Sequence, residues 1–151
     1  MIALGSDHGG LELKTAVLRL LADRGLETRD MGTDNGDSVD YPDFAEKVAL
    51  AISRGEAELG VLICGTGIGM SITANKYPGV RAALVTDEYM AKMAREHNNA
   101  NILVMGGRVL TVETARRLVE AWLDARYEGG RHQRRLDKIA RIEQDVRAGR
   151  I

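Results

Sequence analysis

The chain contains little of several residue types on which whole classes of protein depend. Its 151 residues include one cysteine, two prolines, one tryptophan and one phenylalanine. A single cysteine excludes an internal disulfide framework, and no stretch approaches the roughly 20 consecutive apolar residues of a membrane span. The amino terminus runs directly into Gly5-Ser-Asp-His8 and does not resemble a signal peptide. We therefore expect a cytoplasmic protein without a membrane partner.

The charges give no reason to expect a nucleic-acid partner, because the formal net charge at pH 7 is -1. Residues 131–151 differ from the rest, with seven Lys or Arg against three acidic residues. This segment is either a solvated helix face or a cationic arm that closes over an anionic substrate. A chain of this length is expected to form one domain, 1–151, in which 131–151 is a basic C-terminal helical arm.

Apolar segments of strand length alternate along the chain with segments of helical spacing. The expected strands are 2–4, 27–31, 59–64, 80–85 and 102–105, and the expected helices are 11–24, 42–54, 70–76, 88–97, 111–127 and 131–147. Strands separated by helices predict a parallel sheet with right-handed crossovers. The pattern therefore indicates an α/β three-layer sandwich with five parallel strands in flavodoxin-like order, followed by a C-terminal helix.

The most informative stretch is Val61–Gly69, where an apolar strand runs into a glycine-rich turn with Cys64 at the junction. Alternate glycines leave N–H groups free to face an anion, and a helix from Met70 would add its dipole. A thiol held there would ionise more easily than a free one. In a flavodoxin-like order the first and third strands meet at the ligand-binding switch point, so Asp7 and His8 should lie beside this turn.

Each candidate also has a purely structural interpretation. The glycine turn matches neither the Walker pattern nor the dinucleotide fingerprint, and a lone cysteine at a strand end is often a small buried hydrophobe. The remaining candidates could serve as a helix cap (Asp7), a turn residue (His8), a helix-terminal charge (His97) or one solvated helix face (Arg131 and Arg135).

Seven segments, taken together and in order, resemble the B type of ribose-5-phosphate isomerase. They are Gly5-Ser-Asp-His-Gly-Gly10, Asp40-Tyr-Pro42, Ile63-Cys-Gly-Thr-Gly-Ile-Gly69, Ala74-Asn-Lys76, Glu96-His-Asn98, Gly107-Arg-Val109 and Tyr127-Glu-Gly-Gly-Arg-His-Gln133. That family also includes galactose-6-phosphate and allose-6-phosphate isomerases. The resemblance implies a Rossmann-like fold, a homodimer or dimer of dimers, and an aldose–ketose isomerisation that needs no metal and no cofactor.

The resemblance also implies a role for each matching residue. Cys64 would be the base that moves the proton, and His97 the acid that assists ring opening. The enediolate would be received by the Thr66 hydroxyl and by the backbone of Gly65, Thr66, Gly67, Ile68 and Gly69. Sugar contacts would come from Asp7, His8, Tyr41 and Asn98, and phosphate contacts from Arg108, Arg131 and Arg135. One branch of the family uses a glutamate just after the turn; Met70 stands there, which leaves Cys64 as the candidate base.

Chain direction suggests that one copy of the chain carries only part of this site. His97 ends the helix after the fourth expected strand, so it should lie at the amino edge of the sheet, opposite Cys64. We expect His97 and Asn98 to reach the Cys64 turn of a neighbouring subunit, unless the loop 99–101 bends back. Ribose 5-phosphate is the leading substrate. The alternatives are another sugar phosphate (allose 6-phosphate, galactose 6-phosphate or a tetrose phosphate) and a non-catalytic domain that senses a nucleotide or phosphate.

Overall fold

The computed structural model describes residues 1–151 and contains one sheet of five strands, all parallel. The strands are β1 (Ile2–Ser6), β2 (Thr28–Asp30), β3 (Leu59–Cys64), β4 (Ala82–Leu84) and β5 (Ile102–Gly106), in the order β2-β1-β3-β5-β4. The expected five-stranded parallel sheet and the adjacency of β1 and β3 are confirmed. The strand order predicted from the flavodoxin pattern is wrong at one end, because β5 and not β4 lies next to β3.

The exchange of the last two strands follows from their length and burial. Every residue of β5 is buried, whereas β4 is three residues long and only half-buried. The longer apolar strand gains more from a central place with neighbours on both sides, and a short strand is the safer edge. The connection from β4 to β5 crosses the sheet in the opposite direction to the connection from β3 to β4. With right-handed crossovers, the helix between β4 and β5 therefore lies on the opposite face from the helix between β3 and β4.

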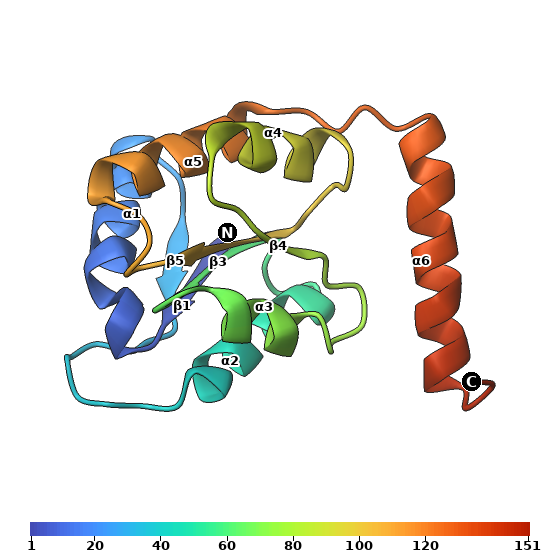
Figure 1. The fold of residues 1–151 in the computed structure, drawn as a ribbon, viewed down its shortest axis with the longest axis horizontal. Coiled ribbons are helices and arrows are strands. Elements are labelled where there is room, and N and C mark those ends of the chain that lie inside the picture. The colour runs from blue at the N-terminus through green and yellow to red at the C-terminus, as the bar shows by residue number, and fades with distance from the viewer.

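Helices cover both faces of the sheet (Figure 1). One face carries α1 (Leu11–Asp23), α4 (Glu88–Glu96) and α5 (Val112–Asp124), and the other carries α2 (Tyr41–Ser53) and α3 (Ile68–Ala74). A 3-10 turn, η1 (His8–Gly10), links β1 to α1. Successive residues of a strand point to opposite faces of the sheet, so Leu62 packs in the core on the α2 face and Ile63 in the core on the α1 face. This is the three-layer sandwich that the sequence predicts.

Two helices, α3 and α5, differ from the expected bounds by two or three residues at an end, and the others differ by one residue at most. α3 begins at Ile68 and not at Met70, because Gly67 adopts φ of 83° and turns the chain into the helix at once. α5 ends at Asp124 and not at Tyr127, since Ala125 is extended and the following segment runs across the end of α4, where Glu128 N–H donates to the Glu96 carbonyl. The expected strands 27–31 and 80–85 shorten to β2 and β4, which lie at the sheet edges.

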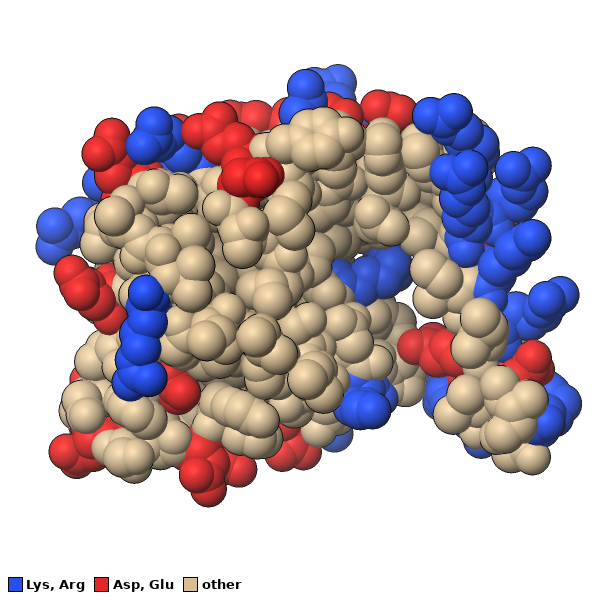
Figure 2. Space-filling model, in the orientation of Figure 1, with Lys and Arg blue, Asp and Glu red and all other residues tan.

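The last helix, α6 (Arg131–Arg147), has the predicted bounds and stands apart from the sandwich (Figure 1). His132 and Leu136, in its first turns, are its buried residues. Farther along, Gly79 N–H donates to Glu143 at 2.9 Å. Its Lys and Arg side chains gather along the side turned away from the body, with a hollow on the other side (Figure 2). No helix, α6 included, combines the length and the apolar character needed to cross a bilayer.

Candidate functional site

The candidate residues fall into two groups at opposite edges of the sheet. The carboxyl-edge group follows β1, β3 and β5, or packs against their end turns, and consists of Asp7, His8, Tyr41, the Cys64–Gly69 turn and Arg108. The amino-edge group lies where α4 ends and α6 begins, and consists of His97, Asn98, Arg131 and Arg135. Parallel strands bring all their carboxyl ends to one edge, so the first group assembles as the sequence predicts.

Cys64 ends β3 and is 4% exposed, with its thiol free. Its Sγ accepts a hydrogen bond from the N–H of Gly67 at 3.2 Å. The Thr66 hydroxyl accepts in turn from the N–H of Ile68 at 3.3 Å. Two N–H groups of the turn are therefore already engaged, one of them by the sulfur, where it would stabilise a negative charge. To receive an oxyanion, these two N–H groups would have to give up their bonds within the turn.

Asp7 and His8 lie beside this turn, and each has a structural bond of its own. The Asp7 carboxylate accepts a hydrogen bond from Gly9 N–H at 2.9 Å and caps η1. The interpretation of Asp7 as a helix cap is therefore confirmed. His8 Nδ1 accepts from the N–H of Val39 at 3.2 Å. That bond needs the lone pair of Nδ1, so the ring proton of His8 lies on Nε2, which can act as a donor.

Close approach of neighbouring turns brings Arg108 and Tyr41 to the cysteine loop. Arg108 N–H donates to the Gly65 carbonyl at 2.9 Å, and the guanidinium lies against Gly65. A side chain at Gly69 would collide with the Tyr41 ring, so glycine is required there for the ring to cover the turn. Arg108 and Tyr41 thus frame the Cys64 turn on two sides.

The amino-edge group does not reach Cys64 within one chain. The ladder between β3 and β5 pairs Gly60 with Ile102 and Cys64 with Gly106, four residue steps that span about 13 Å. His97 precedes Ile102 and lies beyond the starting end of that ladder. Its loop does not bend back, because the carbonyl of Asn101 accepts from Gly60 N–H at 2.8 Å at the same edge.

Two arginines secure the loop that carries His97 and Asn98. Arg81 Nε donates to the carbonyl of Asn99 at 3.0 Å, and Arg95 Nη1 donates to that of Ala100 at 3.0 Å. Burial lowers the pKa of Arg95, and the charge of Arg81 lowers it further. Asn99 adopts φ of 45°, a conformation uncommon outside glycine. The loop is therefore held in one shape at a position remote from the sulfur.

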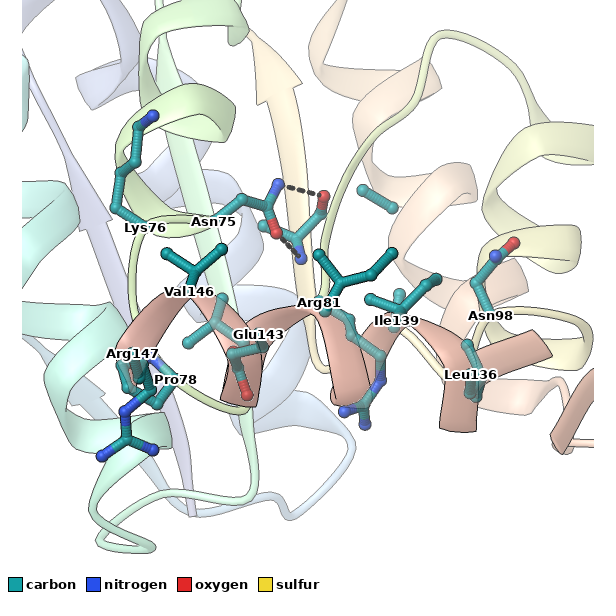
Figure 3. A pocket seen from close by; sticks show the side chains of 15 residues that line it. Asn75, Lys76, Pro78, Arg81, Asn98, Leu136, Ile139, Glu143, Val146 and Arg147 are labelled. Atoms are coloured by element: carbon teal, nitrogen blue, oxygen red, sulfur yellow. Dashed lines mark hydrogen bonds between the residues drawn. The ribbon is translucent and has the colours of Figure 1, made fainter. Parts of the chain in front are cut away.

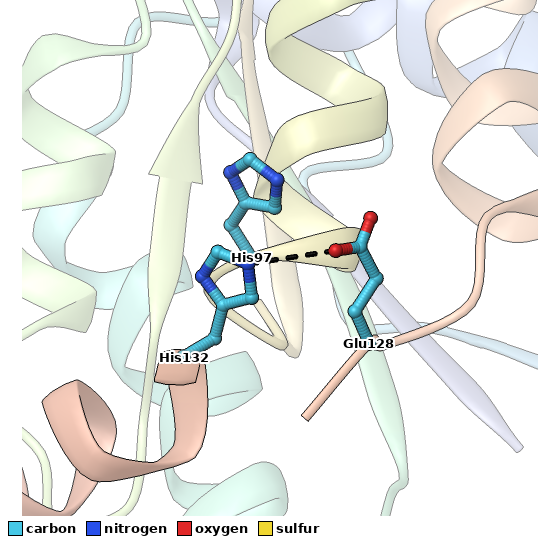
Figure 4. A group of neighbouring side chains, drawn as sticks. All are labelled: His97, Glu128 and His132. Carbon is cyan, nitrogen blue, oxygen red and sulfur yellow. Dashed lines mark ion pairs between the residues drawn. The ribbon is translucent and has the colours of Figure 1, made fainter. Parts of the chain in front are cut away.

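Sequence reasoning missed His132, which joins the amino-edge group. Its ring stacks on that of His97 with centroids 4.1 Å apart and planes 13° apart, and its Nε2 lies 3.5 Å from a Glu128 carboxylate oxygen (Figure 4). The signal was present, since His132, Leu136 and Ile139 follow helical spacing and place the histidine on the apolar face. One ligand atom from each of His97, Glu128 and His132 lies within 4.8 Å of the others. Nitrogen lone pairs lie in the ring planes, so near-parallel rings would have to turn before sharing a metal ion.

A cavity of about 580 Å³ separates α6 from the body. Apolar side chains of α6, namely Leu136, Ile139, Ile142 and Val146, line one side (Figure 3). The body side carries Lys76, Pro78, Val80 and Arg81, all from the segment between α3 and β4, and Asn98 also lines the cavity. The cavity does not touch the Cys64 turn, and its apolar wall is unlike a sugar-phosphate pocket.

Comparison with known proteins identifies the family and the fold. A family model described as Ribose/Galactose Isomerase matches residues 2–139. Ribose-5-phosphate isomerase B of Escherichia coli (strain K12) is 49% identical over 143 residues, 95% of this chain and 96% of that protein. The structure of Clostridium thermocellum ribose-5-phosphate isomerase B has a TM-score of 0.94 at 52% identity, covering 96% of this chain and 98% of that one. The Mycoplasma genitalium ribose-5-phosphate isomerase B structure with bound ribulose-5-phosphate has a TM-score of 0.92 at 44% identity, covering 95% and 96%. The chain belongs to the ribose/galactose isomerase family.

Proposed function

We propose that this protein interconverts ribose 5-phosphate and ribulose 5-phosphate through an enediolate, with Cys64 as the base. The observation that carries the proposal is the cysteine sulfur at the end of β3, bonded to Gly67 N–H and framed by Arg108 and Tyr41. The similarity to ribose-5-phosphate isomerase B structures, one of them with bound ribulose-5-phosphate, supports the choice of substrate.

The reaction needs a base, a donor to oxygen and a grip on the phosphate. Ring opening transfers a proton to the ring oxygen and removes one from the C1 hydroxyl, which leaves an aldehyde. The base then takes the C2 proton, the electron pair of that bond forms the C1=C2 double bond, and the π pair of the C1 carbonyl moves onto O1 to give the enediolate. Return of the proton to C1, with transfer of the O2 proton to O1, gives the ketose. No atom is gained or lost in the interconversion.

Cys64 suits the step at carbon because its sulfur is buried and already accepts a backbone hydrogen bond. Thr66, Asp7 and His8 lie on or beside the same turn and would contact the sugar hydroxyls, with His8 donating from Nε2. Arg108, on the neighbouring turn after β5, lies against Gly65 and can hold one side of the phosphate, for which a guanidinium fork is well shaped. The carboxyl-edge group thus supplies the base and part of the phosphate grip.

The ring-opening acid and the remaining arginines must come from a second chain. Proton transfer requires heavy atoms about 3 Å apart, whereas His97 lies beyond the far end of a ladder about 13 Å long. In a two-fold homodimer, the amino-edge group of one subunit would complete the carboxyl-edge group of the other, and each dimer would hold two sites. His97 would then open the ring, Asn98 would contact the sugar, and Arg131 and Arg135 would close on the phosphate.

Exposed apolar side chains indicate how the two copies meet. Ile68 and Ile72 of α3 are 54% and 60% exposed, and α3 begins in the Cys64 turn. Ile139, Ile142 and Val146 of α6 are exposed to a similar degree, and α6 carries Arg131 and Arg135 in its first turns. Apolar patches of this kind mark interaction surfaces. If α6 of one subunit covered α3 of its partner, the arginines would approach the partner's cysteine turn.

The test of the reaction is proton NMR in deuterium oxide with aldose phosphates of four, five and six carbons. We expect isomerisation of ribose 5-phosphate with deuterium entering C2. Cys64→Ala should lower turnover by at least three powers of ten while substrate still binds, because the carbon base is lost. Ile151→Ser, which is exposed and far from both groups, serves as the control. Near-normal turnover by Cys64→Ala would refute the base assignment, and binding without turnover across the panel would favour a sensing domain.

Subunit mixing tests the shared site. Cys64→Ala and His97→Asn proteins, each inactive alone, are mixed in equal amounts and allowed to exchange subunits. Random exchange makes half of the dimers mixed, and each mixed dimer regains one intact site of two, so about a quarter of wild-type activity should return. If the site lay within one chain, mixed dimers would hold no intact site. Absence of recovery after proven exchange would therefore contradict the shared site.

A further inference from the structure

A stack of two rings, His97 on His132, joins the end of α4 to the first turn of the helix α6. The rings lie 4.1 Å apart and 13° from parallel (Figure 4). His97 follows the last residue of α4, and His132 is the second residue of α6. His132 is 5% exposed, which is unusual for a histidine in the first turn of a basic helix. Its burial therefore calls for a specific role.

The backbone fixes His132 independently of any ligand. Its N–H donates to the Gly129 carbonyl at 3.0 Å. The preceding segment is tied to the end of α4, because Glu128 N–H donates to the Glu96 carbonyl at 3.0 Å. The Glu128 carboxylate lies 3.5 Å from His132 Nε2. His132 is thus held by the segment before α6, which is itself tied to the end of α4, whereas His97 is partly exposed at the end of a helix.

The surroundings of His132 keep its imidazole neutral near pH 7. Burial lowers its pKa, and the neighbouring charges of His97, Arg131 and Arg135 lower it further, while Glu128 acts in the opposite direction. Two stacked imidazolium rings would repel each other, so the pair favours at most one positive charge. A neutral ring face accepts both a neutral and a cationic partner, the latter through the cation–π attraction.

We propose that His132 is a positioning residue that fixes the ring plane of His97 by stacking, and that it contacts neither the reacting atoms nor the phosphate. This inference rests on the proposed function in one respect, the assignment of His97 as ring-opening acid. An acid that must both give and take a proton needs a partner that holds its ring in either charge state. A side chain that is buried, flat, neutral and anchored in the backbone meets that need.

Three substitutions at His132 distinguish the contribution of its flat ring from that of its ring nitrogens. His132→Phe keeps a flat ring without nitrogen, whereas His132→Ala and His132→Gln remove the ring. We expect the Ala and Gln variants to lose tenfold to a hundredfold in kcat with ribose 5-phosphate, on the order of the cost of misplacing a catalytic group. KM should stay within about twofold, and the Phe variant should keep kcat within about threefold of wild type. Arg134→Ala, exposed and outside both groups, is the control on the same helix.

A second readout does not depend on turnover. The chain has three histidines, so their ring-proton resonances can be assigned by single substitutions. Stacking on His132 should displace the His97 resonances upfield; the displacement should persist in His132→Phe and vanish in His132→Gln. The His132 resonance should titrate below the ordinary pH range of histidine. A merely structural role would lower the melting temperature without this pattern.

Several outcomes would overturn the inference. A Phe variant as slow as the Gln variant would show that a nitrogen is needed, and a raised KM with unchanged kcat would make His132 a phosphate ligand. Full activity of the Gln variant, or no upfield displacement in the wild type, would remove the positioning role. A wild-type protein that isomerises no sugar phosphate would instead contradict the proposed function, so the two failures are distinguishable.

Discussion

The apolar face of α6 provides the most direct test of how two chains assemble. Ile139, Ile142 and Val146 are 51%, 54% and 57% exposed, and they line the cavity between α6 and the body. The perturbation replaces all three by serine. Serine, isoleucine and valine have similar helix propensities, so α6 itself should persist. Because these side chains are half-exposed in a single chain, the change should affect association far more than folding.

The expected magnitude follows from the area left to bury. Complete burial of an isoleucine or valine contributes about 1.5–3 kcal/mol, so the exposed half contributes about 1 kcal/mol for each side chain. Three side chains in each of two symmetric subunits give about 6 kcal/mol. That free energy corresponds to roughly four powers of ten in the dissociation constant of the dimer.

The assay is sedimentation velocity over a range of protein concentrations, with specific activity measured on the same samples. We expect the triple-serine protein to be monomeric at concentrations where the wild type is dimeric, and to lose activity in parallel. Ile151→Ser removes an equally apolar and more exposed side chain outside this face and should change neither quantity. Unchanged association of the triple variant would refute the reasoning, and so would full activity of a monomer.

Three further predictions concern stability. Lys14 is 1% exposed and donates to the Asp30 carboxylate and the Thr33 carbonyl, so Lys14→Met should destabilise the fold by about 2–3 kcal/mol in urea titration. Trp122→Ala, in a fully buried position, should cost about 3–5 kcal/mol by the same measurement. The hydrogen bond from Arg24 lowers the pKa of Asp124, so this pair stabilises above the carboxyl's unfolded pKa and is lost as the pH falls. Both groups are solvent-exposed, and Asp124→Asn should therefore change stability by less than about 1 kcal/mol at pH 7.

The elements best predicted from the sequence are those whose limits are set locally. β3 and α6 have the expected bounds because an apolar run ends in alternate glycines in one case, and a glycine pair precedes a long periodic segment in the other. The place of the carboxyl-edge group was predictable for a related reason, since parallel strands deliver their ends to one edge. Knowing that β1 and β3 are neighbours is sufficient to bring His8 to the cysteine turn.

Features that depend on competition between distant segments were harder to predict. The positions of β4 and β5 depend on which of the two apolar strands is stabilised more by a central position in the sheet. The sequence pattern of either strand, taken alone, does not show the outcome of that comparison. The partner of His132 is 35 positions away, and only the course of the segment after α5 brings the rings together. The periodicity of α6 predicts a buried apolar face, but it cannot specify that the covering surface is absent from the same chain.

Division of the proposed site between two edges would link activity to assembly. One copy of the chain holds the sulfur and Arg108, and the histidine and two arginines that would complete its site lie at the opposite edge of the sheet. A monomer therefore keeps Cys64 and His97 at opposite ends of a ladder about 13 Å long and leaves an apolar helix face exposed. Docking of a second copy would remove both deficiencies in one step. Specific activity should consequently follow the fraction of dimer on dilution, with a midpoint at its dissociation constant.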